Sequence, residues 1–279
     1  MGLLAFFKPV PGMTAEAVRH FLRQHNPDDY QLLDVRQPGE YNQGHLPGAR
    51  LIPVGRLEEQ LSELDPRKTT IVYCGSGVRS RGATAVLLQA GFSDVFNMNG
   101  GIQVWRGGIA RDDDSLLQSW FAPAATPEQH LALAWHLEEG TRRFYTELSQ
   151  RDDLAAAAGL MRDLVGAEGR HKATLAALYE GVSGRRANPG FPAGILEEEP
   201  DEVVMEGGLT LSAALAWSHG KSLAEILELA MALELNAYDR YLMLRRKAED
   251  DTVRRVFEVI SDEEKRHLER LTKLYEEGL

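Results

Sequence analysis

Two Glu-x-x-His motifs lie in the second half of this sequence. Glu168 precedes His171 in the first motif, and Glu264 precedes His267 in the second, 96 residues later. On a helix, residues three apart project from one face, so each motif presents a carboxylate beside an imidazole. The positions of the same helical phase are mostly apolar, and Leu271 is one of them. Polar groups on an apolar stripe are costly unless something pairs with them, and a metal ion would do so.

The spacing around the two motifs also repeats. A lone glutamate lies 30 residues before each motif, with Glu138 before Glu168 and Glu234 before Glu264. A tyrosine follows each lone glutamate by seven positions, as Tyr145 and Tyr241. One Glu-x-x-His arises often by chance on a charged helix, but matched spacings on both copies argue against chance. The sequence therefore indicates an internal duplication of a helical hairpin that carries these polar residues.

Where two glutamates are neighbours in the sequence, their positions around the helix indicate which one faces inward. Glu138 shares a face with apolar residues, whereas Glu139 shares one with Arg143, so we expect Glu138 to point inward. Glu263 also lies within helical reach of the second motif's histidine, but the duplication selects Glu264.

The apolar periodicity predicts four helices, at 127–149, 153–181, 222–248 and 251–277. Thr126 followed by Pro127, and Ser222 followed by Glu225, supply N-terminal caps for the first and third helices. Short connections after these two helices favour antiparallel hairpins. Residues 182–221 then serve as the long crossover of a four-helix bundle, with a short helix expected at 212–217.

Four carboxylates and two imidazoles on the inner faces of four helices are typical of ferritin-like proteins with di-iron or di-manganese centres. Mixed oxygen and nitrogen ligation suits Fe or Mn, and four carboxylates offset the charge of two divalent ions. The alternative is that these side chains are surface charges on amphipathic helices. We expect two Fe per chain, with Mn as the other candidate, bound by Glu138, Glu168, His171, Glu234, Glu264 and His267. Tyr145 and Tyr241 are candidate hydrogen-bond donors beside these ligands, with core packing as the alternative.

Residues 1–110 alternate short apolar strands with helices. We expect strands at 31–35, 49–54, 69–74 and 94–98, and helices at 14–24, 55–64 and 79–91. This alternation predicts an α/β domain with a parallel sheet covered on both faces. Residues 111–125, in which three acids are followed by Pro and Ala, are interpreted as a linker to the bundle at 126–279.

Cys74 is the only cysteine in the chain, and it ends the predicted strand 69–74. In parallel sheets the loops after the strand C-termini carry the chemistry. Gly75 and Gly77 let successive backbone N–H groups point inward as an anion cradle. The cradle and the following helix N-terminus would lower the thiol pKa and stabilise a thiolate or persulfide, and Arg79 would hold an oxyanion. The alternative is a buried, inert cysteine.

Residues 28–109 resemble a single rhodanese domain from end to end. The matching pieces are LLDVRQPGEYNQGHLPGARLIPV and IVYCGSGVRSRGATAVLLQAGFSDVFNMNGGIQVW. The resemblance implies that Cys74 carries sulfane sulfur taken from a donor such as thiosulfate. With no second cysteine, the acceptor must be an external thiol or cyanide. The substrate-binding and catalytic loop comprises Cys74, Gly75, Ser76, Gly77, Val78, Arg79 and Ser80, one residue shorter than in related phosphatases.

Residues 126–279 resemble the rubrerythrin branch of the ferritin-like family, through the duplicated Glu-x6-Tyr and Glu-x-x-His. The resemblance implies a di-iron site that acts on peroxide or O2. Some rubrerythrins carry a further carboxylate three residues after the third-helix glutamate, where this chain has Ala237. An attached iron–sulfur module would need four cysteines, so electrons must come from an external donor. The alternatives are a non-catalytic iron-binding bundle, or a dimerisation bundle, joined to a sulfur-carrier domain.

Charge and composition narrow the classes of partner. Residues 1–110 carry a net charge of +1 and residues 111–279 a net charge of −12, which sum to −11. The acidic second half argues against nucleic-acid binding. No apolar run approaches the roughly 20 residues of a membrane span. A single cysteine cannot form an intrachain disulfide, which fits a cytoplasmic protein, and we expect a homodimer.

Overall fold

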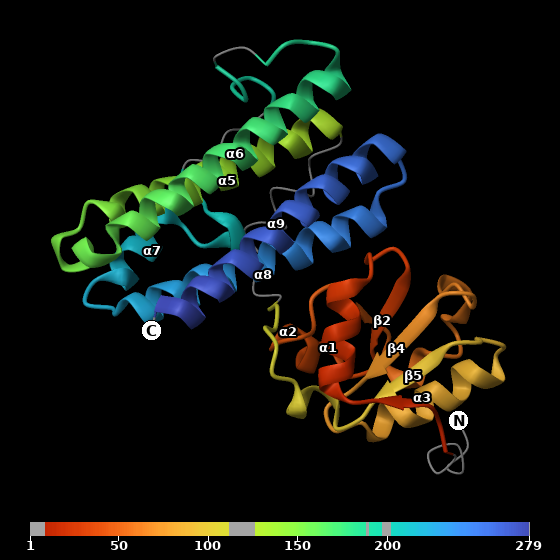
Figure 1. Ribbon diagram of the computed structural model, residues 1–279. Helices are drawn as coiled ribbons and strands as arrows, with labels where there is room; N and C mark the ends of the chain where they lie inside the picture. Colours follow the sequence, from red (N-terminus) through yellow and green to blue (C-terminus); the bar gives the residue numbers. More distant parts are fainter. Residues whose placement is uncertain (1–8, 112–125, 188–189, 197–201, 279) are drawn as a thin grey trace. The chain divides into compact units, whose positions relative to one another are not determined.

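The computed structural model describes residues 9–111, 126–187, 190–196 and 202–278. The chain divides into two units, Met1–Asp113 and Asp114–Leu279 (Figure 1). Apart from Arg111, the predicted linker 111–125 lies outside the described residues.

A five-stranded parallel sheet organises the first unit. Its strands are β1 Gly12–Met13, β2 Tyr30–Asp34, β3 Arg50–Leu51, β4 Thr69–Tyr73 and β5 Val95–Met98, in the spatial order β1-β5-β4-β2-β3. Successive residues of β4 pack on opposite faces: Val72 joins the cluster of Leu87, and Ile71 joins that of Val18. Both faces of the sheet are therefore buried, which confirms the predicted α/β class.

Among the residues that the structure describes, three α-helices accompany this sheet: α1 Ala15–Gln24, α2 Pro38–Asn42 and α3 Val78–Gln89. The predicted helices 14–24 and 79–91 correspond to α1 and α3. Thr14 caps α1, because its side chain accepts a hydrogen bond from the Ala17 N–H. The helix α2 and the short strand β1 were not predicted, since five and two residues are too few to show a period.

The helix predicted at 55–64 was wrong. The structure has two 3-10 turns there, Val54–Arg56 and Leu61–Glu63. Gly55 disfavours a helix by about 1 kcal/mol relative to alanine, and a segment this short cannot nucleate a stable helix on its own. Burial of Leu57 and Leu64 in the core holds the turns in place instead.

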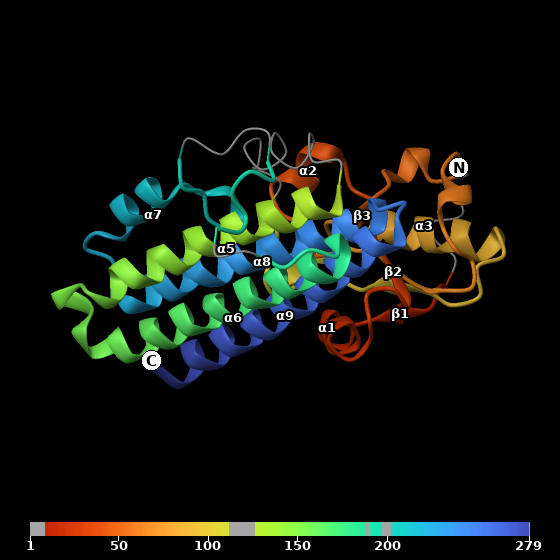
Figure 2. The same cartoon turned by 90° about the horizontal axis from the view of Figure 1, so that it is seen from above.

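Four long helices form the second unit: α5 Pro127–Ser149, α6 Ala158–Ser183, α8 Leu223–Lys247 and α9 Asp251–Gly278. They run side by side as two hairpins, α5 with α6 and α8 with α9 (Figure 2). Capping boxes at Thr126 and Ser222 begin α5 and α8, because each hydroxyl accepts a backbone N–H from the third helical residue. The predicted helical bundle is confirmed. The crossover contains the short helix α7 Leu211–Ser218.

Two apolar clusters fill the bundle. One contains Leu148 and Leu164, and the other contains Leu137 and Leu175. Along each long helix, the predicted polar residue falls between members of the two clusters; Glu138, for example, lies between Leu137 and Phe144. The packing therefore encloses a polar layer between two apolar layers.

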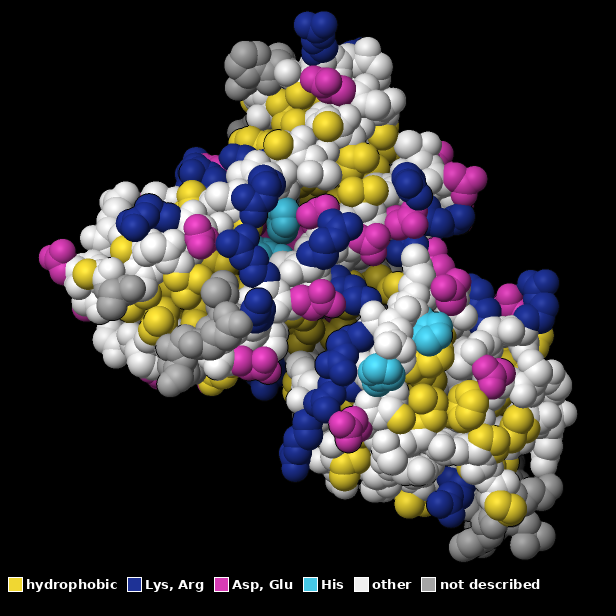
Figure 3. Space-filling view, viewed as in Figure 1, with side chains coloured by type: hydrophobic (Ala, Val, Ile, Leu, Met, Phe, Trp, Pro, Cys, Tyr) yellow, Lys and Arg dark blue, Asp and Glu magenta, His cyan; other side chains and the backbone are white. Residues whose placement is uncertain are grey.

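The exposed face shown in Figure 3 mixes Asp and Glu side chains with Lys and Arg rather than gathering the acids in one patch. On this face, acidic and basic side chains are therefore interspersed. No helix in the described residues combines the length and apolar content needed to cross a membrane.

Candidate functional site

Cys74 follows β4 directly, and α3 begins four residues later at Val78. Its Sγ accepts the backbone N–H of Gly77 at 3.2 Å and that of Ser80 at 3.4 Å, and lies 3.4 Å from the Ser80 hydroxyl. Gly77 has φ of 86°, and a Cβ there would lie 2.9 Å from the Gly100 nitrogen. Only glycine fits this turn without a shift in backbone, and the turn aims the amides at the sulfur.

The carbonyl groups of the same loop point elsewhere. The Cys74 carbonyl accepts the Ile102 N–H at 2.8 Å, and the Gly75 carbonyl accepts the Gln103 N–H at 3.1 Å. Burial raises the pKa of the Cys74 thiol, but hydrogen bonds from Ser80, Ser76 and Gly77 outweigh burial and lower it below its ordinary value. The loop therefore favours a thiolate, as its sequence suggested.

Arg79 forms a bidentate ion pair with Glu40, so its guanidinium group is not directed only at the Cys74 sulfur. Its Nη1 and Nη2 each lie 2.7 Å from a carboxylate oxygen of Glu40 on α2. The pair holds the pKa of Glu40 down at about 2. Val78, beside Arg79, exposes 62% of its surface, whereas Cys74 is fully buried. Arg79 is thus at the loop, where it was predicted, but with a carboxylate partner that sequence did not reveal.

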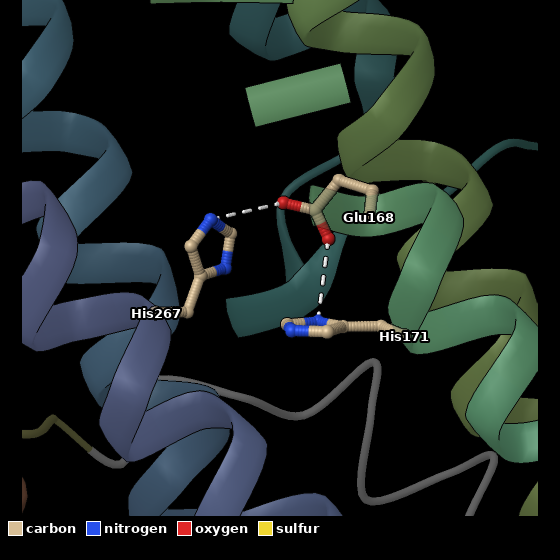
Figure 4. Close-up of side chains that lie close together, drawn as sticks. All are labelled: Glu168, His171 and His267. Carbon is tan, nitrogen blue, oxygen red and sulfur yellow. Dashed lines mark ion pairs between the residues drawn. The ribbon is translucent and has the colours of Figure 1, made fainter. Parts of the chain in front are cut away.

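The bundle brings all six predicted metal ligands together. None exposes more than 7% of its surface, and the four long helices contribute one or two each. Glu168 lies between the two histidines, with one oxygen 3.7 Å from His171 Nδ1 and the other 3.5 Å from His267 Nε2 (Figure 4). Glu264 is fully buried. Glu263 is partly exposed, and its Oε2 lies 3.8 Å from His171 Nε2.

Each lone glutamate lies beside one histidine. Glu138 Oε2 is 3.2 Å from His171 Nδ1, and Glu234 Oε2 is 3.1 Å from His267 Nδ1. Two donors that are both about 2.1 Å from one ion and at right angles would lie about 3 Å apart. Donor triads from both halves lie within 4.8 Å of one another, including Glu138–His171–Glu264 and Glu234–Glu264–His267. These spacings suit a shared pair of metal ions.

Most of the buried donor atoms lack hydrogen-bond partners, whereas Glu138 and His171 are hydrogen-bonded to each other. Among the described residues, none is present for either carboxylate oxygen of Glu168, Glu234 or Glu264, or for either ring nitrogen of His267. Buried polar groups are nearly always satisfied, and each unsatisfied group costs about 1–3 kcal/mol or more. Cations would satisfy all of these atoms at once, so the residues fit the metal centre that the sequence predicted.

The pKa shifts of the clustered carboxyl groups also favour a cation as their partner. Burial, together with neighbouring carboxylates, raises the pKa of Glu138 to about 8 and those of Glu168 and Glu264 well above the ordinary range. Burial also acts on Glu234, but the charge of His267 outweighs it and lowers the Glu234 pKa. Without a cation, the buried interior and the neighbouring carboxylates thus disfavour the ionised form of these acids, and a bound cation would favour it.

Tyr145 and Tyr241 are fully buried near the cluster. Burial raises the pKa of both, with added contributions from Glu234 for Tyr145 and Glu206 for Tyr241. Neither hydroxyl has a hydrogen-bond partner among the described residues. Their role as donors beside the ligands remains a prediction.

Glu206 is a buried carboxylate that sequence reasoning missed. It lies in the crossover and is fully buried, and one of its oxygens lies within 4.8 Å of donors from Glu138 and Glu168. Outside a regular helix there is no phase to show which way a side chain points. The available signal was an isolated acid in the apolar stretch VVMEGGL.

Comparisons with known proteins divide the chain in the same way. A family model for the rhodanese-like domain matches residues 15–107, and one for rubrerythrin matches residues 225–278. The uncharacterised protein YqhL of Bacillus subtilis is 39% identical over 28% of this chain, which spans 63% of that protein.

The thiosulfate sulfurtransferase GlpE of Pseudomonas aeruginosa PAO1 is 32% identical over 34% of this chain and 86% of its own length. A solved rhodanese-like domain protein of Staphylococcus aureus aligns with 37% of this chain and 100% of its own, with 27% identity and a TM-score of 0.35. By its identity with the Pseudomonas protein, the chain belongs to the rhodanese-like family through its first unit, and this unit is fused to a second one in which the rubrerythrin family model matches residues 225–278.

Proposed function

We propose that the first unit is a sulfurtransferase and that Cys74 carries the transferred sulfur. The observation that carries this proposal is the convergence of the Gly77 and Ser80 N–H groups on Sγ. Such donors stabilise negative charge on the thiolate and on a persulfide. The activity named for the Pseudomonas relative supports thiosulfate as the donor.

Two displacements at sulfur would complete this reaction. The Cys74 thiolate attacks the outer sulfur of thiosulfate, a Cys74 S–S bond forms, and sulfite leaves with the electron pair of the broken bond. An external thiolate then attacks the outer sulfur of the persulfide, and Cys74 leaves as a thiolate. No second cysteine exists in this chain to act as the acceptor.

For the second unit we propose a di-iron centre that reduces peroxide. Glu138 and His171 would hold iron in one half of the bundle, Glu234 and His267 would hold it in the other half, and Glu168 and Glu264 would supply the remaining carboxylate ligands. The observation that carries this part is the set of buried, unpartnered donor atoms. Iron supplies reversible one-electron chemistry when it is bound. The apolar layers on either side exclude water, and the electrons come from an external donor.

Metal content tests this part directly. The full chain is reconstituted anaerobically with Fe(II), and metal per chain is measured beside Glu234→Ala. Glu228→Ala is a matched control, because Glu228 is exposed on the same helix. About two irons in wild type and control, with fewer in Glu234→Ala, support the centre. Iron without consumption of peroxide favours a non-catalytic iron-binding bundle.

Sulfite release from thiosulfate tests the first unit. Wild-type protein with cyanide or a small thiol as acceptor is expected to release sulfite, and Cys74→Ser to release none. The same variant should retain its iron, since Cys74 belongs to the other unit. Equal release by both proteins would refute the assignment of Cys74.

A further inference from the structure

A carboxylate from the crossover reaches the polar layer of the bundle. Glu206 begins the 3-10 turn Glu206–Gly208, in a segment outside the four long helices. It exposes none of its surface, and it lies with Glu138 and Glu168 in a group whose donor oxygens are all within 4.8 Å of one another. The duplicated hairpins therefore do not supply every acid in this layer.

The backbone around Glu206 is held against α5. The Glu206 N–H donates to Thr141 Oγ1 at 3.2 Å, and that hydroxyl donates to the Leu137 carbonyl at 3.3 Å. Gly140 lies opposite the carbonyl oxygen of Val204, where a Cβ would be only 2.2 Å from that oxygen. Because Gly140 has no side chain, the crossover backbone can pack against α5 within one helical turn of Glu138.

The crossover also closes on itself. Val204 and Thr210 form an antiparallel bridge, and the Met205 N–H donates to the Leu209 carbonyl at 2.8 Å. Gly207 has φ of 73°, and a Cβ there would lie 2.9 Å from the side chain of Leu233 on α8. The turn is therefore fixed between α5 and α8, and its geometry commits Glu206 to the interior.

Neither oxygen of Glu206 has a hydrogen-bond partner in the described part of the chain. A buried carboxylate without a donor is strongly unfavourable. The groups near it are the carboxylates of Glu138, Glu168 and Glu264, together with Tyr241, whose pKa the charge of Glu206 helps to raise. The partner that would satisfy all of these carboxylates is a cation.

We propose that Glu206 is a fifth carboxylate ligand of the metal centre, delivered by the crossover to the half that contains Glu138 and Glu168. The proposal rests on the proposed di-iron function and deepens it. The 96-residue repeat gives Glu206 no counterpart, because the equivalent position would be residue 110, which is Ala110 of the other unit. The two metal positions are therefore unequal in ligand number and in charge.

Ala237 fits this assignment. It lies on α8, three residues after Glu234, and is buried in an apolar cluster. Thus α8 offers no additional carboxylate from the next turn. The extra acid comes from the crossover instead, on the side of Glu138.

Competition for Fe(II) with a chelator of known affinity, performed anaerobically on the full chain, tests the proposal. Wild type, Glu206→Gln and Glu206→Asp are compared, with Glu202→Gln as control because Glu202 is exposed in the same segment. Wild type and control should bind two equivalents. Glu206→Gln should bind one of them more than about 100-fold more weakly, because loss of an outer-shell partner alone costs about 10–100-fold.

Two further readouts separate ligation from other roles. Thermal unfolding of the metal-free proteins should show that Glu206→Gln is at least as stable as wild type, since no hydrogen bond is lost. Glu206→Asp keeps the charge but withdraws the oxygens by one methylene, and should also weaken one equivalent.

Three results would overturn the proposal. If Glu206→Gln binds both equivalents as tightly as wild type, Glu206 is not a ligand, although the di-iron function stands. If Glu206→Asp binds like wild type while Glu206→Gln does not, charge rather than ligation is responsible. If wild type itself binds no iron, the proposal and the di-iron function both fail.

Discussion

Glu234 Oε2 and His267 Nδ1 lie 3.1 Å apart across α8 and α9, yet no hydrogen bond joins them. In the other half of the bundle, His171 Nδ1 and Glu138 Oε2 lie 3.2 Å apart with hydrogen-bond geometry. The two halves thus share a donor spacing but differ in donor orientation. A spacing without a hydrogen bond is expected when both atoms are arranged around a third partner.

Metal binding should stabilise the second unit. A ligand that binds only the folded state at 100 times its Kd adds about 2.7 kcal/mol to the free energy of unfolding. We expect Fe(II), added anaerobically, to raise the Tm of the full chain and a chelator to reverse the rise. The Glu234→Ala variant should show little of it, whereas the exposed-site variant Glu228→Ala should respond as wild type does. A Tm indifferent to iron would leave the bundle as a scaffold.

Cys74 should ionise at a lower pH than a free thiol does. Its pKa is lowered because hydrogen bonds from Ser80 and Gly77 outweigh burial. Titration of the ultraviolet absorbance of the thiolate, with Cys74→Ser as the background, gives the midpoint. Ser80→Ala removes one donor and should move the midpoint to higher pH. A midpoint at or above that of a free thiol in wild type would contradict the stabilising loop.

The Glu40–Arg79 pair should make local stability pH-dependent. The pKa of Glu40 falls from 4.5 to about 2, so its stabilising contribution is present above pH 4.5 and is lost as the pH falls towards 2. Because both side chains are about a third or more exposed, the contribution at neutral pH should stay below about 1 kcal/mol. Amide hydrogen exchange of residues 36–46 measures it in the full chain. Glu40→Gln should exchange faster than wild type at pH 7, and the difference should shrink at pH 3.

Two glycine-to-alanine substitutions should have opposite effects. Gly140→Ala places a Cβ 2.2 Å from the Val204 carbonyl oxygen, and the overpacking should cost about 1–3 kcal/mol. Gly169 is an exposed residue in α6, and a Cβ added there would meet nothing within 4 Å, so Gly169→Ala should stabilise by about 0.5–1 kcal/mol. Thermal unfolding of the metal-free chain compares the two. Equal shifts would mean that the crossover does not pack on Gly140 as described.

The position of each residue around its helix explains why the candidate metal ligands on the long helices could be predicted from the sequence. Glu138 could be distinguished from Glu139 because the two residues fall on different faces of α5, and Glu138 is buried while Glu139 pairs with Arg142 and Arg143. The duplicated spacing did the same for Glu264. A periodic pattern shows which way a side chain points only inside a regular helix or strand.

The contacts that sequence could not reveal join distant, irregular segments. Glu40 and Arg79 are 39 residues apart, and nothing local indicates that they pair. Glu206 and Thr141 are 65 residues apart and meet because Gly140 has no side chain. In the segment 55–64, the structure has turns where a helix was predicted, and the buried Leu57 and Leu64 anchor them. Tertiary packing decides such cases.

The enclosure of the polar layer has a consequence for access. Among the six candidate metal ligands on the long helices, His171 is the most exposed, at 7% of its surface. Its Nε2 lies 3.8 Å from the carboxylate of Glu263 on α9. The small exposed part of the layer thus lies at His171, where α6 meets α9. The rates at which metal and small oxidants arrive should therefore depend on how easily these two helices separate.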